Sequence, residues 1–554
     1  MVLDRVSTAS SKSATGAASP MPDPDETTTV ASYDGHRLAT DVYLPSGAGR
    51  RGRSATLLVR TPYGKRGDID RVAELAPCFN AVGVAVVVQD VRGKFASNGA
   101  VVPFVHELAD GHATAQWIAD QPWSNGAVVP FGDSYAGFTS WATAASGHPA
   151  VRAAIVRVTT SHLPDEWMYR QGAFRLQQNA GWAAFAWSDR ELSDVEPDWS
   201  SRPLAEMLGA GGAHLETWLR TNPGSPRWGT EILGHEPPLS RDVDVPVLHW
   251  GGWWDLMARG QLREWQSRAR AGSAPQRLVM GATDHSFNPF SCAYGAAAVT
   301  SFEQQYGVIA DFLSTTVDDT DAVATESCVR WELTHGDWHE DPEWPPRDAE
   351  RRRLHLADAS SAAFGPEGGA LTSVPDSMAT TISLPHDPAD VVPSLETFVW
   401  GTLANAYPDE RDAHIRPDVM TFSGPASDGP IDIVGPVMLR LWQRVPEDGA
   451  QISAVLSDVH PDGRALRIAE GAIELGATTP AGGVQIDLGP LAYRLRHGHR
   501  LRLALAASAF PRYLWHSPDP RAAWSSDGGT PYEVTVRLGG ESFLEVHYYL
   551  RRRS

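Results

Sequence analysis

The sequence has few cysteines and no long apolar run. Only three of its 554 residues are cysteines, Cys78, Cys292 and Cys328, and no two of them are close in the chain. Such a sparse set does not form the disulfide framework of a small secreted protein, and it favours a reducing compartment. No stretch approaches the roughly 18 uninterrupted apolar residues that a membrane-spanning helix requires. We therefore predict a cytoplasmic protein that does not enter a membrane.

Basic residues are scarce relative to acidic ones. The chain has 47 Lys and Arg against 67 Asp and Glu, which gives a formal net charge of −20. This imbalance argues against nucleic acid or an anionic membrane surface as a partner. Metal-ligand spacings are sparse too, and the His497-Gly498-His499 pair is a weak signal. We expect no metal and no cofactor, and we leave open whether the chain forms homo-oligomers.

The length is too great for a single hydrophobic core. Residues 1–26 are rich in Ser, Ala, Thr and Pro, which predicts a disordered leader and leaves open whether translation starts at Met1 or Met21. Continuous apolar runs such as Val84 to Val88 then alternate with helix-like segments. Such runs are typical of parallel strands that helices cover on both faces, so an α/β core is predicted.

The pattern changes twice after this core begins. Helix-compatible spacing without a clear strand predicts a helical cap, and the strand pattern resumes after it. Later, alternating strands separated by Gly, Pro and Asp turns favour a jelly roll. The predicted units are the first part of the α/β domain at 27–160, the cap at 161–241, the second part of the α/β domain at 242–320, and the jelly roll at 321–554.

A strand-to-helix turn carries the first chemical signal. Val128-Val129-Pro130-Phe131 leads into Gly132-Asp133-Ser134-Tyr135-Ala136-Gly137, and a helix-like segment follows. In α/β hydrolases the nucleophilic serine lies on such a turn, where small residues let the helix start close to the strand. Ala136 occupies the second small position in place of glycine. We predict that Ser134 is the nucleophile, although an ordinary strand-to-helix turn would have a similar sequence.

The partners of this serine follow in the chain order that the fold requires, with the acid before the histidine. Asp255 and His285 each come just after a predicted core strand, where open α/β sheets carry their ligand sites. Asp284 adjoins His285, but neighbouring side chains point apart. Asp242 precedes its strand and would lie at the opposite end. A Ser134–His285–Asp255 triad is therefore predicted.

Several motifs in order make the sequence resemble the cocaine esterase and X-prolyl dipeptidyl-peptidase family, also called CocE/NonD-like. The resemblance covers nearly everything after the leader. The matching segments are Arg60-Thr61-Pro62-Tyr63-Gly64-Lys65, Gln89-Asp90-Val91-Arg92-Gly93, Gly132-Asp133-Ser134-Tyr135, Gly252-Trp253-Trp254-Asp255, Asp284-His285-Ser286, Asp458-Val459-His460-Pro461-Asp462-Gly463-Arg464 and Gly498-His499-Arg500-Leu501-Arg502-Leu503.

The resemblance implies an α/β-hydrolase domain with a helical cap and a C-terminal jelly roll. It also implies that the hydroxyl of Tyr63 and the backbone N–H of Tyr135 form the oxyanion hole. One departure concerns the relatives that hydrolyse α-amino-acid esters, which bind the substrate ammonium through carboxylates. Here Leu256, Met257 and Ala258 follow the triad acid, so a cationic substrate group is less favoured.

The 20 tryptophans suggest how the acyl group of a substrate is bound. An apolar pocket needs large hydrophobic side chains near the reacting centre, although the same side chains also fill cores. The tryptophans predicted to line such a pocket are Trp167, Trp182, Trp187, Trp253 and Trp254.

The sequence thus predicts a serine hydrolase that cleaves a carboxylic ester of a small organic substrate through an acyl-enzyme. An amidase or peptidase on the same site, of the X-prolyl dipeptidyl-peptidase or β-lactam acylase type, remains an alternative. So does an acyltransferase. A non-catalytic ligand-binding protein is a fourth reading, which the order of the three triad residues argues against.

Overall fold

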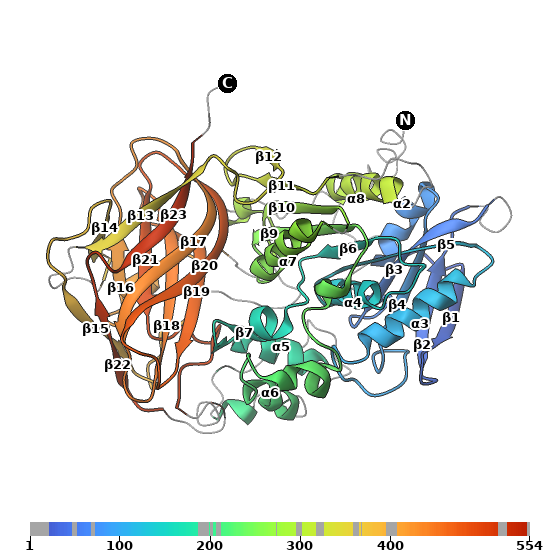
Figure 1. Cartoon of the computed structure of the whole chain (residues 1–554), viewed down its shortest axis with the longest axis horizontal. Coiled ribbons are helices and arrows are strands. Elements are labelled where there is room, and N and C mark those ends of the chain that lie inside the picture. The colour runs from blue at the N-terminus through green and yellow to red at the C-terminus, as the bar shows by residue number, and fades with distance from the viewer. Residues whose placement is uncertain are drawn as a thin grey trace.

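The computed structural model describes residues 21–46, 52–67, 72–186, 199, 203–206, 212–272, 274–294, 302–316, 326–357, 365–366, 368–394, 407–518, 524 and 529–550. Two large sheets dominate these residues, with helices around the first (Figure 1). Most of the leader that the sequence predicts lies outside the described residues.

The first sheet has ten strands in the order β1-β2-β4-β3-β5-β6-β9-β10-β11-β12. Seven successive strands of this order, β4 to β11, pair in parallel. Their apolar residues are almost fully buried, as expected of strands covered on both faces. The strands are β1 (Glu26–Ala31), β2 (Arg37–Tyr43), β3 (Ser54–Thr61), β4 (Ala85–Asp90), β5 (Ser124–Asp133), β6 (Ala154–Arg157), β9 (Val247–Trp254), β10 (Gln276–Asp284), β11 (Cys328–Glu332) and β12 (Trp338–Asp341).

Five helices accompany this sheet: α2 (Ala76–Ala81), α3 (Glu107–Ala119), α4 (Ser134–Ala145), α7 (Ala258–Ala271) and α8 (Phe302–Thr316). The cap holds α5 (Leu176–Ala186), α6 (Gly212–Leu219) and a two-strand hairpin of β7 (Tyr169–Arg170) and β8 (Ala173–Phe174). The mainly helical cap lies below the sheet in the view of Figure 1. None of the helices in the described part of the chain is long and apolar enough to cross a membrane.

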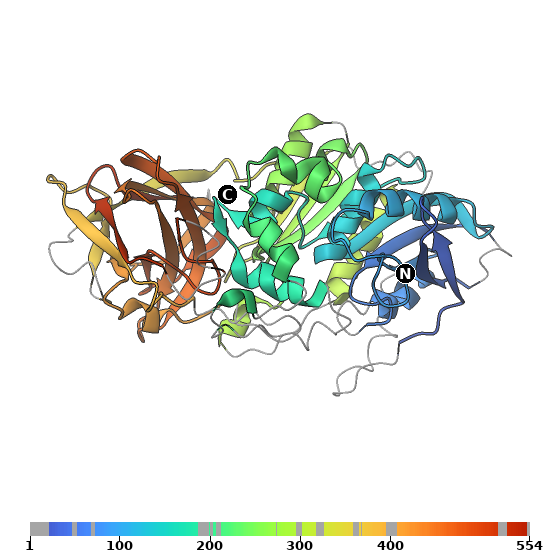
Figure 2. The same ribbon diagram turned by 90° about the horizontal axis from the view of Figure 1, so that it is seen from below.

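The second sheet has eleven strands and encloses its own apolar core. Its strands are β13 (Ala349–Ala357), β14 (Gly369–Thr372), β15 (Thr381–His386), β16 (Met420–Ser423), β17 (Ile431–Arg444), β18 (Ala450–Val459), β19 (Ala465–Leu475), β20 (Gly482–Leu495), β21 (Arg500–Ala506), β22 (Tyr532–Arg537) and β23 (Phe543–Tyr549). Figure 2 shows them as a separate β unit beside the first domain. This is the predicted combination of an α/β-hydrolase domain with a C-terminal β domain.

Two strands that follow residue 321 belong to the first sheet. Residues 321 onward were assigned to the jelly roll, yet β11 pairs in parallel with β10, and β12 pairs with β11. Both strands therefore belong to the first sheet. The two units also touch through backbone, because Thr334 N–H donates to Ala492 O and Arg494 N–H donates to Thr334 O.

Candidate active site

Ser134 lies on a sharp turn between β5 and α4. Its φ is +56°, a left-handed conformation that a non-glycine residue adopts only under constraint. A Cβ at Gly132 would lie 2.4 Å from the carbonyl carbon of Ala136. A Cβ at Gly137 would lie 2.6 Å from the Thr159 side chain. The small residues of the motif thus let the helix begin against the strand, and Ala136 fits the position where glycine is usual.

The structure brings the three predicted triad side chains together. His285 Nε2 lies 3.0 Å from Ser134 Oγ, and His285 Nδ1 lies 2.7 Å from Asp255 Oδ1. The Asp255 side chain is completely buried, and its Oδ1 also accepts the Met257 N–H at 3.1 Å. Because β5, β9 and β10 are parallel, their carboxyl ends place the three residues at one edge of the sheet.

The competing groups lie elsewhere. Asp284 accepts the N–H groups of Ser286 and Asn288 at 2.9 and 2.8 Å, so it holds the loop that carries His285. Burial raises the pKa of Asp284. His249 is buried beside Gln276 Oε1 at 3.0 Å, and burial lowers its pKa to about 4. Neither group takes part in the hydrogen bonds of Ser134.

The two tyrosines that the resemblance assigns to the oxyanion hole lie in one apolar cluster. Tyr63 follows β3, is 2% exposed and stacks on Phe185 with ring centres 5.5 Å apart. Tyr135 begins α4 with Ser134, and the first N–H groups of a helix have no partner within the helix. Its phenol donates to Glu107 Oε1 at 2.9 Å and accepts the Phe104 N–H at 2.8 Å. The Tyr135 side chain is thus fixed away from any role as a hydroxyl donor to substrate.

A buried ion pair that the sequence did not reveal supports this region. Arg60 Nη2 lies 2.9 Å from Glu107 Oε2, and Arg60 Nη1 donates to Glu107 O at 2.7 Å. Burial raises the pKa of Glu107, and Arg60 opposes that rise. Arg60 belongs to a family motif, which was the available signal, but nothing in the sequence identified Glu107 as its partner. The pair holds Tyr135 and hence the start of α4.

The tryptophans predicted to line one pocket lie in different parts of the structure. Trp182 lies 5.1 Å from the Tyr135 ring and lines a small cavity with it, and Trp167 packs against Trp182 in the cap core. Trp253 instead stacks on Trp344 at 4.7 Å in a core between sheet and jelly roll. Trp254 stacks on Phe290 at 4.5 Å. Trp187 lies outside the described residues.

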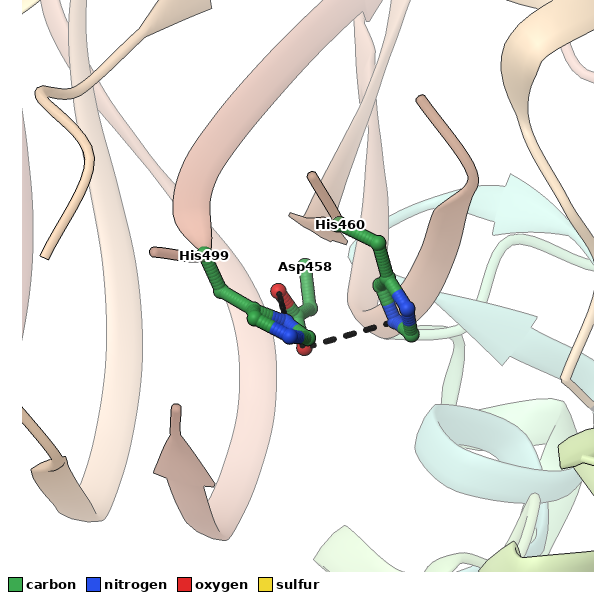
Figure 3. Close-up of side chains that lie close together, drawn as sticks. All are labelled: Asp458, His460 and His499. Atoms are coloured by element: carbon green, nitrogen blue, oxygen red, sulfur yellow. Dashed lines mark hydrogen bonds and ion pairs between the residues drawn. The ribbon is translucent and has the colours of Figure 1, made fainter. Parts of the chain in front are cut away.

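Two histidines and an aspartate gather in the jelly roll (Figure 3). Asp458 accepts hydrogen bonds from His499 Nδ1 at 2.9 Å and from the Tyr493 hydroxyl at 2.6 Å. His460 Nε2 lies 3.7 Å from the same carboxylate.

A cation is poorly suited to this cluster. Burial and the nearby guanidinium groups of Arg464 and Arg496 lower the pKa of His460. A divalent cation would add charge beside both guanidinium groups and would break the Asp458–His499 hydrogen bond. We interpret the cluster as a set of hydrogen bonds that stabilises the jelly roll. The expectation of no metal stays a prediction.

The serine lies on a strained strand-to-helix turn, the histidine is hydrogen-bonded to this serine, and the aspartate is hydrogen-bonded to the histidine. Together with the fold, this arrangement defines a serine hydrolase of the α/β-hydrolase class. Comparison with known proteins specifies the family. Residues 34–287 match the family model of the X-Pro dipeptidyl-peptidase (S15 family), and residues 321–526 match the X-Pro dipeptidyl-peptidase C-terminal non-catalytic domain. The chain belongs to the cocaine esterase and X-Pro dipeptidyl-peptidase family.

Similar proteins agree over nearly the whole chain. The cocaine esterase of Rhodococcus sp. (strain MB1 Bresler) is 29% identical over 527 residues, which is 87% of this chain and 90% of that protein. An α-amino acid ester hydrolase has the same fold, with a TM-score of 0.75 at 21% identity over 97% of this chain and 99% of that one. An aminopeptidase from a marine sediment archaeon, Thaumarchaeota archaeon, has a TM-score of 0.75 at 18% identity, over 97% of this chain and 100% of that one.

Proposed function

We propose that this serine hydrolase cleaves carboxylic esters of small organic molecules, with Ser134 as nucleophile, His285 as general base and Asp255 as the residue that orients the imidazole. The observation that carries the proposal is the continuous hydrogen-bond chain from Ser134 Oγ through His285 to Asp255 Oδ1, with separations of 3.0 and 2.7 Å. A serine hydroxyl is a poor nucleophile without such a base.

The reaction proceeds in two halves. Ser134 Oγ attacks the ester carbonyl while His285 Nε2 takes its proton, and Asp255 stabilises the imidazolium that forms. His285 then gives the proton to the leaving alkoxide as the C–O bond breaks, and an acyl-enzyme remains. In the second half, water attacks the acyl-enzyme while His285 takes its proton, and the carboxylic acid leaves as His285 returns the proton to Ser134 Oγ. The Tyr135 N–H and the Tyr63 hydroxyl stabilise the negative oxygen in both halves.

Two observations favour an uncharged ester over an amino-acid derivative or a peptide. The residues after Asp255 are Leu256, Met257 and Ala258, so no carboxylate in this segment binds a substrate ammonium. Met257 is fully buried in the cap core beside Trp182 and Phe185. The cocaine esterase that is 29% identical to this chain also hydrolyses an ester, as its name states.

Turnover of matched p-nitrophenyl esters and p-nitroanilides tests the proposal, with acyl chain length and aromaticity varied. We expect ester hydrolysis with a preference for apolar acyl groups and little anilide cleavage. Anilide cleavage without ester cleavage would favour the amidase alternative. Transfer of the acyl group to an added alcohol or amine, in place of water, would favour the acyltransferase alternative.

Ser134→Ala should abolish ester turnover in this assay. Ser140→Ala is the matched control, because Ser140 lies on the same helix, is equally buried, and only donates to Ala136 O at 2.8 Å. Equal activity of the two variants would contradict the assignment of Ser134.

A further inference from the structure

A small cavity with an unusual number of arginines lies behind the triad acid, between the first domain and the jelly roll. Its volume is about 60 Å³, which exceeds the roughly 10–15 Å³ that a cavity needs to hold one water molecule. Asp255 forms part of its wall. The arginines that line it are Arg170 of β7, Arg259 of α7, Arg467 of β19 and Arg512, which follows β21.

Two of these arginines have close carboxylate partners. Arg467 Nη2 lies 2.6 Å from Glu410 Oε1. Arg512 Nη2 lies 2.6 Å from Glu470 Oε1. Their charges are therefore balanced within the protein.

The other two arginines form longer ion pairs, and the acidic residues Asp255 and Glu470 line the cavity with them. Arg259 Nε lies 3.6 Å from Asp487 Oδ1, and Arg170 Nη1 lies 3.9 Å from Glu166 Oε2. Glu166 already binds Arg263 at 2.7 Å. The side chains of Arg170 and Arg259 are only 6% and 8% exposed, so solvent does little to screen their charge.

Each of these two side chains also has a buried N–H donor without a hydrogen-bond partner among the described residues. Arg259 Nη2 donates to Glu470 O at 2.6 Å, but Nη1 has no hydrogen-bond partner in the described part of the chain. Arg170 Nε likewise has none among the described residues, and its Nη2 makes only a long contact of 3.4 Å to Leu256 O. Buried donors of charged groups are normally satisfied, because leaving them unpaired is costly.

A further buried arginine strengthens the positive potential. Arg175 is 3% exposed and donates from Nη1 to the backbone oxygen of Glu166. Burial and the nearby Arg170 and Arg512 lower the pKa of Arg175 to about 9. An anion in the cavity would offset this repulsion between like charges.

We propose that the cavity is a binding site for a small inorganic anion, of halide or tetrahedral-oxyanion size, held chiefly by Arg170 and Arg259. The anion accepts hydrogen bonds from the guanidinium N–H groups that have no partner among the described residues. Because Arg170 belongs to the cap, Arg259 to the hydrolase domain and Arg512 to the jelly roll, the anion joins the three parts of the molecule. The site shares Asp255 with the triad proposed for Ser134, but its test does not depend on activity.

Thermal unfolding of the full chain tests the site. The protein is exchanged into sodium gluconate, whose anion is too large for the cavity, and chloride, bromide, sulfate or phosphate then replaces gluconate at constant ionic strength. A ligand that binds only the folded state raises the unfolding temperature in a saturable way. We expect a saturable rise of about 2 °C or more for at least one of these anions. The halide and oxyanion series distinguish which kind of anion fits.

Variants locate the effect. Arg259→Gln and Arg170→Gln should remove most of the anion-dependent rise. Arg268→Gln should keep it, because Arg268 is equally buried on α7 but contacts Asp244 and does not line the cavity. The absence of any specific rise in the wild-type protein, or an undiminished rise in both cavity variants, would overturn the proposal.

Crystals of the wild-type protein soaked in bromide provide a test that needs no variant. Anomalous scattering should show a bromide between the guanidinium groups of Arg170 and Arg259 if the site takes halides. If the solution titration selects an oxyanion, sulfate density is expected there instead. A cavity that holds only water in both crystals would contradict the proposal.

Discussion

Replacing Asp255 by asparagine tests whether Asp255, and not the nearby Asp284, is the triad acid. In the reaction, a positive charge develops on His285 next to a fully buried carboxylate whose oxygen lies 2.7 Å from Nδ1. Charges centred about 4 Å apart attract by about 4 kcal/mol at an effective dielectric constant of about 20. At about 1.4 kcal/mol per factor of ten, the loss of this attraction alone slows the reaction about 10³-fold.

Asparagine also disturbs the imidazole itself. Its amide can stabilise the wrong tautomer of His285, with the proton on Nε2, and this extends the expected loss towards about 10⁴-fold. We therefore expect kcat of Asp255→Asn to fall by about 10³ to 10⁴ with little change in KM, since the substrate does not contact Asp255 in this account. Steady-state kinetics on a p-nitrophenyl ester, with thermal unfolding to confirm the fold, measures both effects.

Asp284→Asn is the control for this experiment. Asp284 adjoins His285, but its Oδ1 accepts two N–H groups of its own loop at 2.8 and 2.9 Å, and an asparagine Oδ1 can still accept both; only the bond from Asn288 Nδ2 to Oδ2 is lost. Its kcat should fall by less than about tenfold, since the hydrogen bonds of the imidazole to Asp255 and Ser134 stay in place. Similar losses in both variants, or a larger loss for Asp284→Asn, would refute the assignment of Asp255.

Three further changes test other parts of the account. Gly132→Ala places a Cβ 2.4 Å from the backbone of Ala136; the turn must shift, and we expect kcat to fall at least about 10²-fold, as measured by ester turnover. Tyr63→Phe should lower kcat by about 10² to 10³ at similar KM by removing an oxyanion donor. Tyr43→Phe, another buried tyrosine of the first sheet, should leave kcat unchanged, and equal effects of the two would contradict the role of Tyr63. Burial lowers the pKa of His249 to about 4. The unfolded state therefore takes up the proton first as pH falls below about 6.5, and stability decreases by about 2 kcal/mol by pH 5. The unfolding temperature of His249→Gln should depend less on pH between 7 and 5 than that of the wild type, and an unchanged dependence would contradict this reading.

The positions of the triad residues could be predicted because each follows a buried strand. A parallel sheet brings the carboxyl ends of such strands to one edge, so Ser134, Asp255 and His285 needed no knowledge of distant contacts. The hairpin of β1 and β2 is likewise a local feature, because Asp34-Gly35 forms its turn and Gly35 has a φ of +85°.

The direction of a large side chain depended on residues far away in the sequence. Trp253 and Trp254 are neighbours, yet one stacks on Trp344 and the other on Phe290. Sequence spacing cannot tell which face of β9 meets which later segment. The partner of Arg60 was hidden for the same reason, because Glu107 lies on a helix 47 residues further on.

β11 and β12 follow residue 321, where the predicted C-terminal unit and the family match to the C-terminal domain both begin, yet both strands belong to the first sheet. The residues of β11 alternate between buried and more exposed, as in Val329, Arg330 and Trp331. Its partner β12 is antiparallel. Such alternation is typical of antiparallel sheets, so in the sequence β11 looks like the strands of the β domain that follows it.

The most direct test of the central claim is covalent labelling with a fluorophosphonate, followed by mass spectrometry of the intact protein and of its peptides. The account predicts one adduct on the wild-type protein, located on Ser134, and none on Ser134→Ala. Labelling that maps to another residue, or that persists in Ser134→Ala, would contradict it.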